Sequence, residues 1–442
     1  MQLFALPRGR AFFLAATLRR EPDMSFLIEG CRVYAGGQLV SRPLGVSDGR
    51  IVSADTVSNA PVFHFDDCVL LPGFVDVHVH LREPGFSYKE TIGTGTLAAA
   101  HGGFTAVCAM PNLNPVPDSI ESLNIQREMI RRAARVEVFP YGALTVGERG
   151  ERIADLEGMA PNVIAFSDDG RGVQDAAIIR EAMTRAAALR KIVAAHCEDN
   201  SLLNGGYIHA GRYAKAHNHR GIVSESEWRP IERDLKLADE TKCAYHVCHV
   251  STKESVALIR AAKKSGVNVT CETAPHYLTL CEDDLQEHGR FKMNPPLRAA
   301  ADRDALLEGL CDGTIDMIAT DHAPHAAEEK ARGLAGSPMG VVGLETAFPV
   351  LYTELVRRGV ITLERLIELM AFSPAHRFGL ERSWGEGARA DFTIFDLNKR
   401  YMIDPSAFLS MGRATPFEGR AVHGECLMTV HKGQIAWQKD AR

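Results

Sequence analysis

Two histidines separated by a single residue, His78 and His80, stand at the end of an apolar run. In an extended strand, side chains two residues apart point to the same face, so both imidazoles can reach one metal ion. Imidazole is a common zinc ligand, and Co²⁺ or Mn²⁺ can substitute for zinc at such sites. A His-x-His pair is frequent by chance, so its context decides whether it binds metal.

That context is a series of polar residues at the ends of later apolar runs. They are Asn112, Asp168, Asp169, His196, His249 and Asp321. One histidine at a strand end is usually a packing residue, but four histidines, with aspartates after two of the runs, indicate a metal site. A mononuclear catalytic zinc uses three protein ligands. The larger set predicts two metal ions about 3.5–4 Å apart that share a carboxylate.

His246 provides an internal comparison. It lies three residues before His249 and therefore has the opposite strand parity. If His249 faces the site, His246 is expected to face the surrounding helices and to hold no metal.

The elements that must position these residues form an alternating pattern. Helical segments such as 175–191 and 253–264 lie between many of the apolar runs, which predicts a parallel sheet with helices outside. Eight runs predict an α/β fold of the (β/α)8 TIM-barrel type, whose sites gather where the strands end. The eight runs are 69–77, 104–110, 136–144, 162–166, 192–196, 243–249, 267–272 and 316–320.

Both ends of the chain have a different texture, with short alternating strands broken by Gly and Ser. We expect residues 24–71 and 384–442 to form a composite β-sandwich domain beside a barrel at 72–383. Residues 1–23 are interpreted as a disordered extension ahead of a start at Met24. The alternative is a weak signal peptide, but the apolar stretch at 12–18 is short and lacks a clear cleavage site.

Composition excludes several classes of function. The net charge is −6 and the sequence pI about 6.3, so nucleic acid and anionic membranes are not expected partners. No apolar run reaches the roughly 18 residues that span a bilayer. The ten cysteines are scattered, several of them within apolar runs, which is typical of buried thiols in a cytoplasmic protein.

Several blocks of the sequence resemble the dihydroorotases of the amidohydrolase superfamily, and most closely those of class I. The likeness spans roughly Phe26 to Gln438. The resemblance implies reversible hydrolysis of the cyclic amide of (S)-dihydroorotate to N-carbamoyl-L-aspartate in pyrimidine biosynthesis. The blocks are GFVDVHVHLREPG at 73–85, AMPNLNPVPDS at 109–119, AFSDDG at 165–170, HCED at 196–199, KMNPPLR at 292–298, TDHAPH at 320–325 and GEGARADFTIFD at 385–396.

The resemblance implies a role for each ligand and two Zn²⁺ per subunit. The first metal takes His78, His80 and Asp321, the second takes His196 and His249, and Asp169 bridges them. Asp169 is preferred to Asp168 on motif alignment alone. Hydantoinases, allantoinases and some dihydroorotases bridge with a carboxylated lysine, which is not available after the fourth strand here because no lysine lies between Lys89 and Lys191.

The resemblance also implies a substrate site. Arg82, Asn112 and His325 match the group that holds the ring carboxylate, which Arg can bind bidentately. Asn294 and the backbone of Met339 and Gly340 match contacts to the ring amides, with His80 nearby. Asp321 is the expected catalytic proton carrier. For Arg82 the alternative is a surface ion pair with Glu83 or Glu90, and the polar segment 326–340 is either a mobile loop over the site or a passive connection.

Other functions remain open at this point. The nearest alternative is another cyclic amidohydrolase, an allantoinase or hydantoinase, against which Arg82 and the missing lysine argue. A different class is a non-catalytic scaffold that binds aspartate transcarbamoylase, although such chains lose their metal ligands. We expect a homodimer, and a complex with aspartate transcarbamoylase is left open.

Overall fold

The computed structural model describes residues 25–380 and 383–440, so the predicted extension at 1–23 lies outside the described residues. Its centre is a ring of parallel strands, each pairing with the next. A parallel bridge between Val79 and His322 joins the last strand region to the first and closes the ring. The strands are β8 Phe74–Val79, β9 Phe104–Ala109, β10 Glu137–Pro140 with β11 Gly142–Ala143, β12 Phe166–Ser167, β13 Ile192–Ala195, β16 Ala244–Val247, β17 Val269–Thr273 and β18 Met317–Ile318.

The predicted fold class is confirmed, and the eight apolar runs correspond to the eight barrel strands in order. Two boundaries differ. The first run, 69–77, is two strands, because β7 (Val69–Pro72) pairs with terminal strands and only β8 enters the barrel. The third run is interrupted at Tyr141, which separates β10 from β11.

Helices follow the strands, and side chains cap the N-termini of several of them. Asp175 caps the backbone N–H groups of α4 and Thr252 caps α7, at the starts of the two helical segments predicted from sequence. The helices of eight or more residues are α1 Ile92–His101, α2 Ile120–Ala133, α4 Ala176–Ala188, α6 Glu225–Thr241, α7 Lys253–Lys264 and α9 Ala300–Asp312. The short ones are α3 Leu156–Met159, α5 Arg212–Ala216, α8 Pro275–Thr279, α10 Ala327–Lys330, α11 Gly333–Gly336, α12 Ala347–Leu351, α13 Leu363–Ile367 and α14 Ser373–Arg377.

Single turns and one small parallel pair complete the connections. Two π-helical segments, η7 and η8, extend α12 and α13. The pair is β14 Ile208–His209 with β15 Gly221–Ile222, and the turns are η1 Ala54–Val57, η2 Val146–Glu148, η3 Ala160–Asn162, η4 Asn200–Leu202, η5 Glu282–Asp284, η6 Gly289–Phe291, η7 Tyr352–Val356, η8 Glu368–Phe372 and η9 Pro405–Ala407. Among the described helices, none is long and apolar enough to cross a membrane.

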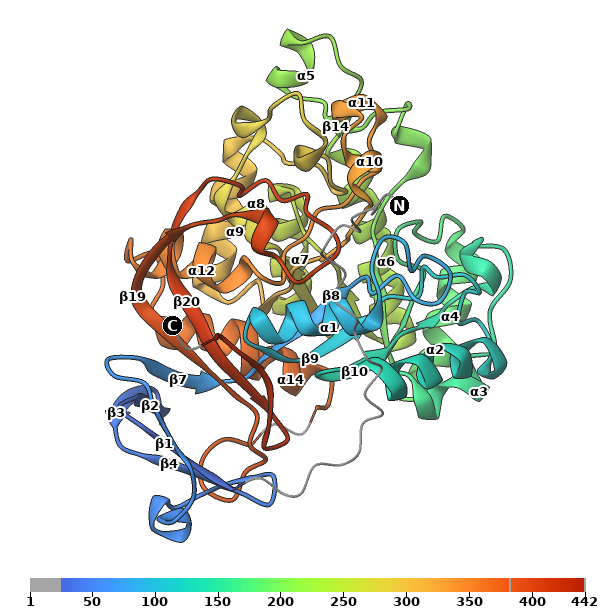
Figure 1. Ribbon diagram of the computed structural model, residues 1–442. Helices are drawn as coiled ribbons and strands as arrows, with labels where there is room; N and C mark the ends of the chain where they lie inside the picture. The colour runs from blue at the N-terminus through green and yellow to red at the C-terminus, as the bar shows by residue number, and fades with distance from the viewer. Residues whose placement is uncertain (1–24, 381–382, 441–442) are drawn as a thin grey trace, which may run out of the picture.

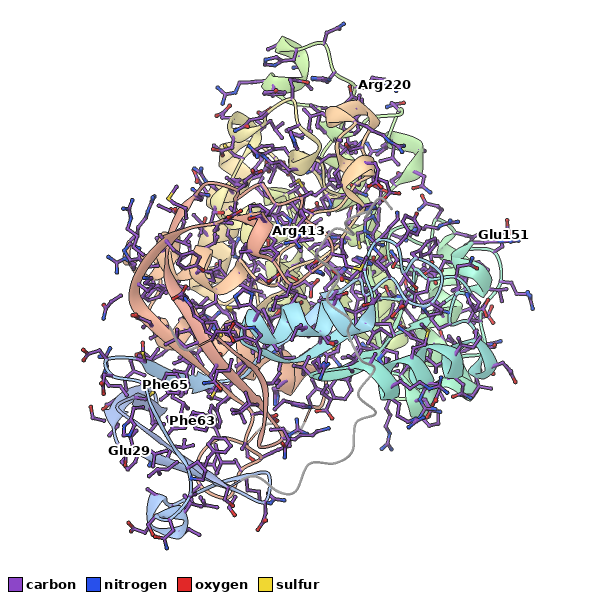
Figure 2. The ribbon with its side chains drawn as sticks, viewed as in Figure 1. Glu29, Phe63, Phe65, Glu151, Arg220 and Arg413 are labelled. Carbon is purple, nitrogen blue, oxygen red and sulfur yellow. The ribbon has the colours of Figure 1, made fainter. Side chains whose placement is uncertain are left out.

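The two ends of the chain meet in a pair of sheets, ordered β5-β4-β1-β6 and β21-β20-β19-β7-β2-β3. In Figure 1 the blue strands β1 to β4 lie at the lower left, and the red strands β19 and β20 run beside them. Figure 2 labels Phe63 and Phe65 there, and the Phe63 ring meets Phe26 edge-on at 5.6 Å. The strands are β1 Phe26–Glu29, β2 Arg32–Ala35, β3 Gln38–Ser41, β4 Leu44–Ser47, β5 Arg50–Val52, β6 Val62–His64, β7 Val69–Pro72, β19 Phe392–Met402, β20 Ala421–His431 and β21 Gln434–Gln438.

The six-stranded sheet is shared between two apolar cores. On β7, Leu70 packs into the core between the two terminal sheets, whereas Val69 and Leu71 pack into the core around the barrel. Strand alternation explains this division, because neighbouring side chains point to opposite faces.

Aromatic rings join the shared sheet to the barrel. The buried Phe348 ring lies 4.2 Å from Phe395 and 5.2 Å from Phe74, measured between centroids. We expect Phe348→Ala to lower the free energy of unfolding by about 3–5 kcal/mol, since it leaves a cavity at this junction. Urea unfolding measures the loss, with Phe348→Leu as the milder control. An unchanged urea midpoint in Phe348→Ala would contradict the role of this ring.

Candidate active site

His78 and His80 stand at the end of β8, and both are buried. His78 Nε2 lies 3.3 Å from Asp169 Oδ1 and 3.6 Å from Asp321 Oδ1. His80 Nε2 lies 3.5 Å from Asp169 Oδ2 and 3.1 Å from Asp321 Oδ1. The two imidazoles therefore face the same two carboxylates, as the His-x-His spacing predicts.

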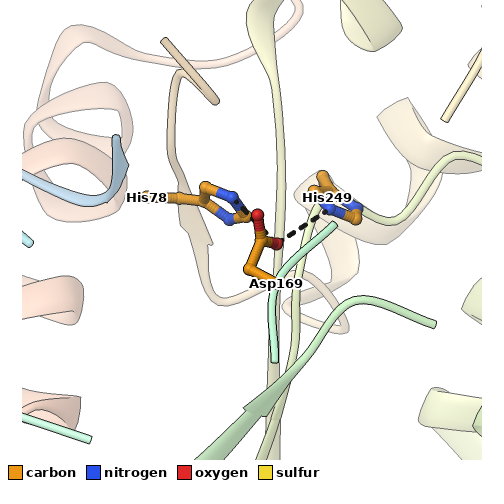
Figure 3. A group of neighbouring side chains, drawn as sticks. All are labelled: His78, Asp169 and His249. Atoms are coloured by element: carbon orange, nitrogen blue, oxygen red, sulfur yellow. Dashed lines mark ion pairs between the residues drawn. The ribbon is translucent and has the colours of Figure 1, made fainter. Parts of the chain in front are cut away.

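The second pair of predicted ligands lies on the other side of Asp169. His196 follows β13 and His249 follows β16, and their rings approach with 2.9 Å between His196 Nδ1 and His249 Nε2. Asp169 Oδ1 lies 3.7 Å from His249 Nε2 and 3.9 Å from His196 Nδ1. Figure 3 shows Asp169 between His78 and His249, with ion pairs to both. The structure thus brings all six predicted ligands together.

The geometry fits a divalent cation. His78 Nε2 and Asp169 Oδ1 are buried and have no hydrogen-bond partner among the described residues, although buried polar atoms are nearly always paired. Three groups have ligand atoms within 4.8 Å of one another: His78 with Asp169 and His249, His78 with His80 and Asp321, and His78 with Cys248 and Glu272. Imidazole and carboxylate donors in these numbers suit zinc.

The two neighbouring aspartates have different surroundings. Asp168 Oδ1 accepts hydrogen bonds from the backbone N–H groups of Leu144 (2.8 Å) and Thr145 (3.0 Å), and Asp168 Oδ2 accepts one from the Thr145 hydroxyl. Both oxygens of Asp168 therefore hold the chain after β11. Asp169 is the one that faces the histidines, which agrees with the motif alignment.

Charge at the site also favours a cation. Burial raises the pKa of Asp169, but the nearby His78 and His249 outweigh it and hold that pKa well below its usual range. Burial opposes ionisation of Asp321 as well, and its close contact with His80 and the charge of His78 lower its pKa overall. Both carboxylates are anionic at neutral pH.

Glu272 on β17 is a site residue that the sequence analysis missed. Its Oε1 accepts a hydrogen bond from His78 Nδ1 at 2.8 Å, which orients the ring so that Nε2 faces Asp169. Burial raises the pKa of Glu272, but His78 and His246 outweigh it and lower that pKa to about 2. The signal was present in the sequence, because Glu272 ends the seventh apolar run.

The prediction for His246 is wrong in direction. His246 lies inside the barrel, where its Nε2 donates to Glu272 Oε2 at 3.1 Å and its ring packs against Phe378. Strand β16 ends at Val247, and His249 has a φ of +33°, so strict alternation does not connect the two histidines. His246 is not among the side chains whose ligand atoms lie close enough together to share a metal ion with His80 or His249.

Arg82 is buried beside the cluster of histidines and aspartates, at the start of the segment after β8. Its Nε donates to the carbonyl of Pro324 at 3.1 Å, and its Nη2 lies 3.4 Å from His325 Nε2. Burial lowers its pKa to about 10, so the guanidinium stays charged. The alternative ion pairs are not formed: Glu83 accepts from the backbone of α1, and Glu90 accepts from Ser410 and the backbone N–H of Met411.

The other predicted substrate residues lie around the same site. His80 Nδ1 donates to Asn112 Oδ1 at 2.8 Å, and Asn294 Nδ2 lies 3.3 Å from His196 Nε2. Asn294 Nδ2 also donates to Glu198 Oε1 at 2.9 Å. Glu198 is a second residue that sequence reasoning missed, although it lies two positions after His196.

The segment 326–340, predicted as either a mobile loop or a passive connection, contains the short helices α10 and α11. Its Lys330 ammonium is buried and donates to the carbonyls of Lys292 (3.0 Å), Pro338 (3.0 Å) and Gly340 (2.7 Å). Burial lowers the pKa of Lys330 to about 7, and its three hydrogen bonds fix the backbone next to Met339. These contacts hold the segment against Lys292 beside the site.

Three residues of the site have left-handed backbone conformations that side chains disfavour: Arg82 (φ +62°), His249 (φ +33°) and Asp321 (φ +48°). Each such conformation costs about 1–3 kcal/mol in a non-glycine residue. The surrounding hydrogen bonds maintain this strain at the point where the ligands converge, which is typical of a functional site.

Comparisons with known proteins agree with this geometry. A family model described as "Dihydro-orotase-like" matches residues 67–255. Proteins named "Dihydroorotase" from Bacillus cereus (strain AH820) and Bacillus anthracis are 52% identical to this chain over 425 residues, which cover 95% of the chain and 99% of each relative. The chain belongs to the dihydroorotase family.

The fold of this dihydroorotase-family chain is similar to those of several solved structures. An L-hydantoinase (dihydropyrimidinase) from Arthrobacter aurescens matches with a TM-score of 0.82 and 27% identity, over 94% of this chain and 96% of that one. A dihydropyrimidinase from Brevibacillus agri matches with a TM-score of 0.80 over 93% of this chain and 95% of that one, and at 23% identity it supports the fold alone. The protein is a cyclic amide hydrolase of the TIM-barrel amidohydrolase type.

Proposed function

We propose that the protein hydrolyses the ring amide of (S)-dihydroorotate to N-carbamoyl-L-aspartate, reversibly, as a step of pyrimidine biosynthesis. One observation carries the choice of substrate: the charged, buried Arg82 guanidinium lies beside His325 next to the histidine and aspartate cluster. A buried guanidinium needs an anionic partner, and dihydroorotate carries a ring carboxylate. Hydantoin and allantoin carry none.

We further propose two Zn²⁺ per subunit, with Co²⁺ or Mn²⁺ as substitutes. His78, His80 and Asp321 would hold one ion, His196 and His249 the other, and Asp169 both. The orphaned atoms His78 Nε2 and Asp169 Oδ1 support this assignment. Bound zinc supplies a water molecule acidified to a pKa of about 7 and a polarised carbonyl.

The residues of the chain then divide the work. Arg82 and Asn112 hold the carboxylate and thereby orient the ring, and His325 lies beside the Arg82 guanidinium. Asn294 and the backbone of Met339 and Gly340 hold the amide edges.

Asp321 handles the proton. It accepts a proton from the attacking water and delivers it to the ring nitrogen as the C–N bond breaks. In the reverse direction the same carboxylate takes the proton from the carbamoyl nitrogen as the ring closes.

Arg82→Met is the first test of the substrate. We expect KM for dihydroorotate to rise strongly with the metal content unchanged, because loss of a buried ion pair to the carboxylate costs about 2–5 kcal/mol. Steady-state kinetics and elemental analysis measure the two quantities. Arg82→Lys is the matched control, which keeps the charge but loses the bidentate geometry. Unchanged kinetics in Arg82→Met would remove Arg82 from the substrate site and reopen the allantoinase alternative.

The function itself is tested by turnover of dihydroorotate, hydantoin and allantoin by the metal-loaded protein. Turnover of dihydroorotate alone supports the proposal. Turnover of hydantoin or allantoin in its place favours the related hydrolases, and no turnover with full metal content favours the non-catalytic partner of aspartate transcarbamoylase.

We also propose that the enzyme is a homodimer. Analytical ultracentrifugation of the protein, alone and mixed with aspartate transcarbamoylase, tests the dimer and a complex in one experiment. A monomer at micromolar concentration would contradict the dimer.

A further inference from the structure

Lys89 is a cation of the site that the proposed chemistry does not use. It lies between β8 and α1, and only 14% of its side chain is exposed. Its ammonium lies 3.1 Å from His325 Nδ1 and 3.3 Å from Glu329 Oε1. These contacts join the segment after β8 to the segment after β18, across the side of the site that carries Arg82.

The contact with His325 fixes the position of a proton. A lysine ammonium has three donors and no acceptor, so His325 Nδ1 must accept and cannot carry hydrogen. A neutral ring then carries its hydrogen on Nε2, which lies 2.7 Å from the carbonyl oxygen of Met339. His325 therefore donates to the backbone that is proposed to hold the substrate's amide edge.

The same ring has a second arrangement within reach. His325 Nδ1 also lies 3.4 Å from Glu329 Oε2, and Nε2 lies 3.4 Å from Arg82 Nη2. With the hydrogen on Nδ1, His325 would donate to Glu329 and accept from Arg82. The Met339 contact would be lost, and one arm of the guanidinium would be engaged by His325.

We propose that Lys89 is a positioning residue that selects the first arrangement. By donating to His325 Nδ1 it keeps the Nε2–H on the Met339 carbonyl, and it leaves the Arg82 guanidinium available for the substrate carboxylate. This inference rests on the proposed function and deepens it, because it adds a residue that acts on the carboxylate site through His325.

The charges around the ring support a neutral His325. Burial, followed by the charges of Arg82 and Lys89, lowers the pKa of His325 to about 3. The groups that face it are Arg82 and Lys89 from the segment after β8 and Glu329 and Lys330 from α10. Loss of the Lys89 charge removes one of the influences that keep the ring unprotonated, so the His325 pKa rises.

The test uses Lys89→Met, which keeps the length of the side chain and removes its donors, and Lys89→Gln, which replaces the donor-only end by one that can also accept. Lys89→Arg is the matched control, since it retains a donor-only cation. In both test variants we expect KM for dihydroorotate to rise roughly 10- to 100-fold, because a lost hydrogen bond to a charged group has an effect of this size. We expect kcat to stay within about threefold, because Asp321 and the metal ligands are untouched, and Lys89→Arg to restore most of KM.

A second readout needs no substrate. ¹⁵N spectra of histidine-labelled, metal-loaded enzyme report which ring nitrogen carries hydrogen, and His325→Gln identifies the signal. We expect hydrogen on Nε2 in the wild type and on Nδ1, or on both nitrogens at mildly acid pH, in Lys89→Met. An unchanged tautomer with an unchanged KM would overturn the proposal, and so would a fall in kcat with no change in KM. A wild type that does not turn over dihydroorotate contradicts the proposed function instead, and the ¹⁵N spectra still decide the Lys89–His325 contact.

Discussion

Asp321→Asn is expected to lower kcat by about 10²–10⁴-fold in both directions, while dihydroorotate still binds. General acid–base catalysis by one group is typically of this size. Asparagine keeps the shape of the side chain and an oxygen toward His80 Nε2, which lies 3.1 Å from Asp321 Oδ1. It cannot accept a proton. The other carboxylate that faces both histidines, Asp169, is assigned to bridging.

The pH profile gives a second expectation for the same variant. Asp321 must be anionic to accept the proton, so activity falls as the pH drops through its pKa. Burial alone would raise that pKa, but His80 and His78 hold it below the usual aspartate range. The corresponding acid limb therefore lies at low pH in the wild type, and it should be absent from Asp321→Asn.

The rate and the metal content of Asp321→Asn are measured side by side. Turnover near that of the wild type with both metals present would contradict the proton-carrying role. Glu198→Gln is a useful comparison, because Glu198 lies 3.6 Å from His196 Nε2 and is a carboxylate of the site outside the six proposed ligands. We expect a smaller fall in kcat there than in Asp321→Asn.

Asp169→Asn is expected to cost the protein at least one of its metal ions. Asp169 lies within 3.9 Å of all four ligand histidines, and its anionic form is strongly favoured. Loss of a residue that only orients a ligand costs 10–100-fold in metal affinity. Loss of the shared carboxylate should cost more than about 100-fold, and activity should fall with occupancy.

The neighbouring position supplies the matched control. Asp168→Asn retains an oxygen for the backbone N–H groups of Leu144 and Thr145, so the fold should persist and both metals should stay bound. Elemental analysis after dialysis compares the two variants. Full metal content in Asp169→Asn, or metal loss in Asp168→Asn alone, would reverse the assignment of the bridging residue.

The barrel and most of the site could be predicted because local signals and topology agree. Each apolar run has a strand at its core, and the helices at Ala176–Ala188 and Lys253–Lys264 begin behind capping residues that the sequence shows directly. Once the runs are ordered as a barrel, the side chains at their ends must meet at one mouth. This is why histidines as far apart in the chain as His78 and His249 could be grouped from the sequence alone.

The errors have different causes, and one of them is that strand alternation was extended beyond where the strand ends. His246 faces the barrel interior although His249 faces the site, because the chain after Val247 leaves the extended conformation and strand parity no longer relates the two positions. The division of 69–77 between two sheets depends on pairing partners more than 300 residues away on β19, which no local pattern contains. Glu272 was overlooked although it ends the seventh apolar run, because a lone glutamate has no second ligand at a fixed spacing to mark it.

The left-handed backbone at Arg82, His249 and Asp321 has an evolutionary consequence. Glycine adopts this conformation without strain, so a substitution to glycine at any of the three positions recovers part of what the native side chain costs the fold. Selection for heat resistance alone would therefore enrich inactive proteins with glycine at these positions. Directed evolution of a more thermostable enzyme needs a simultaneous screen for turnover, because stability and catalysis favour different residues at these three positions.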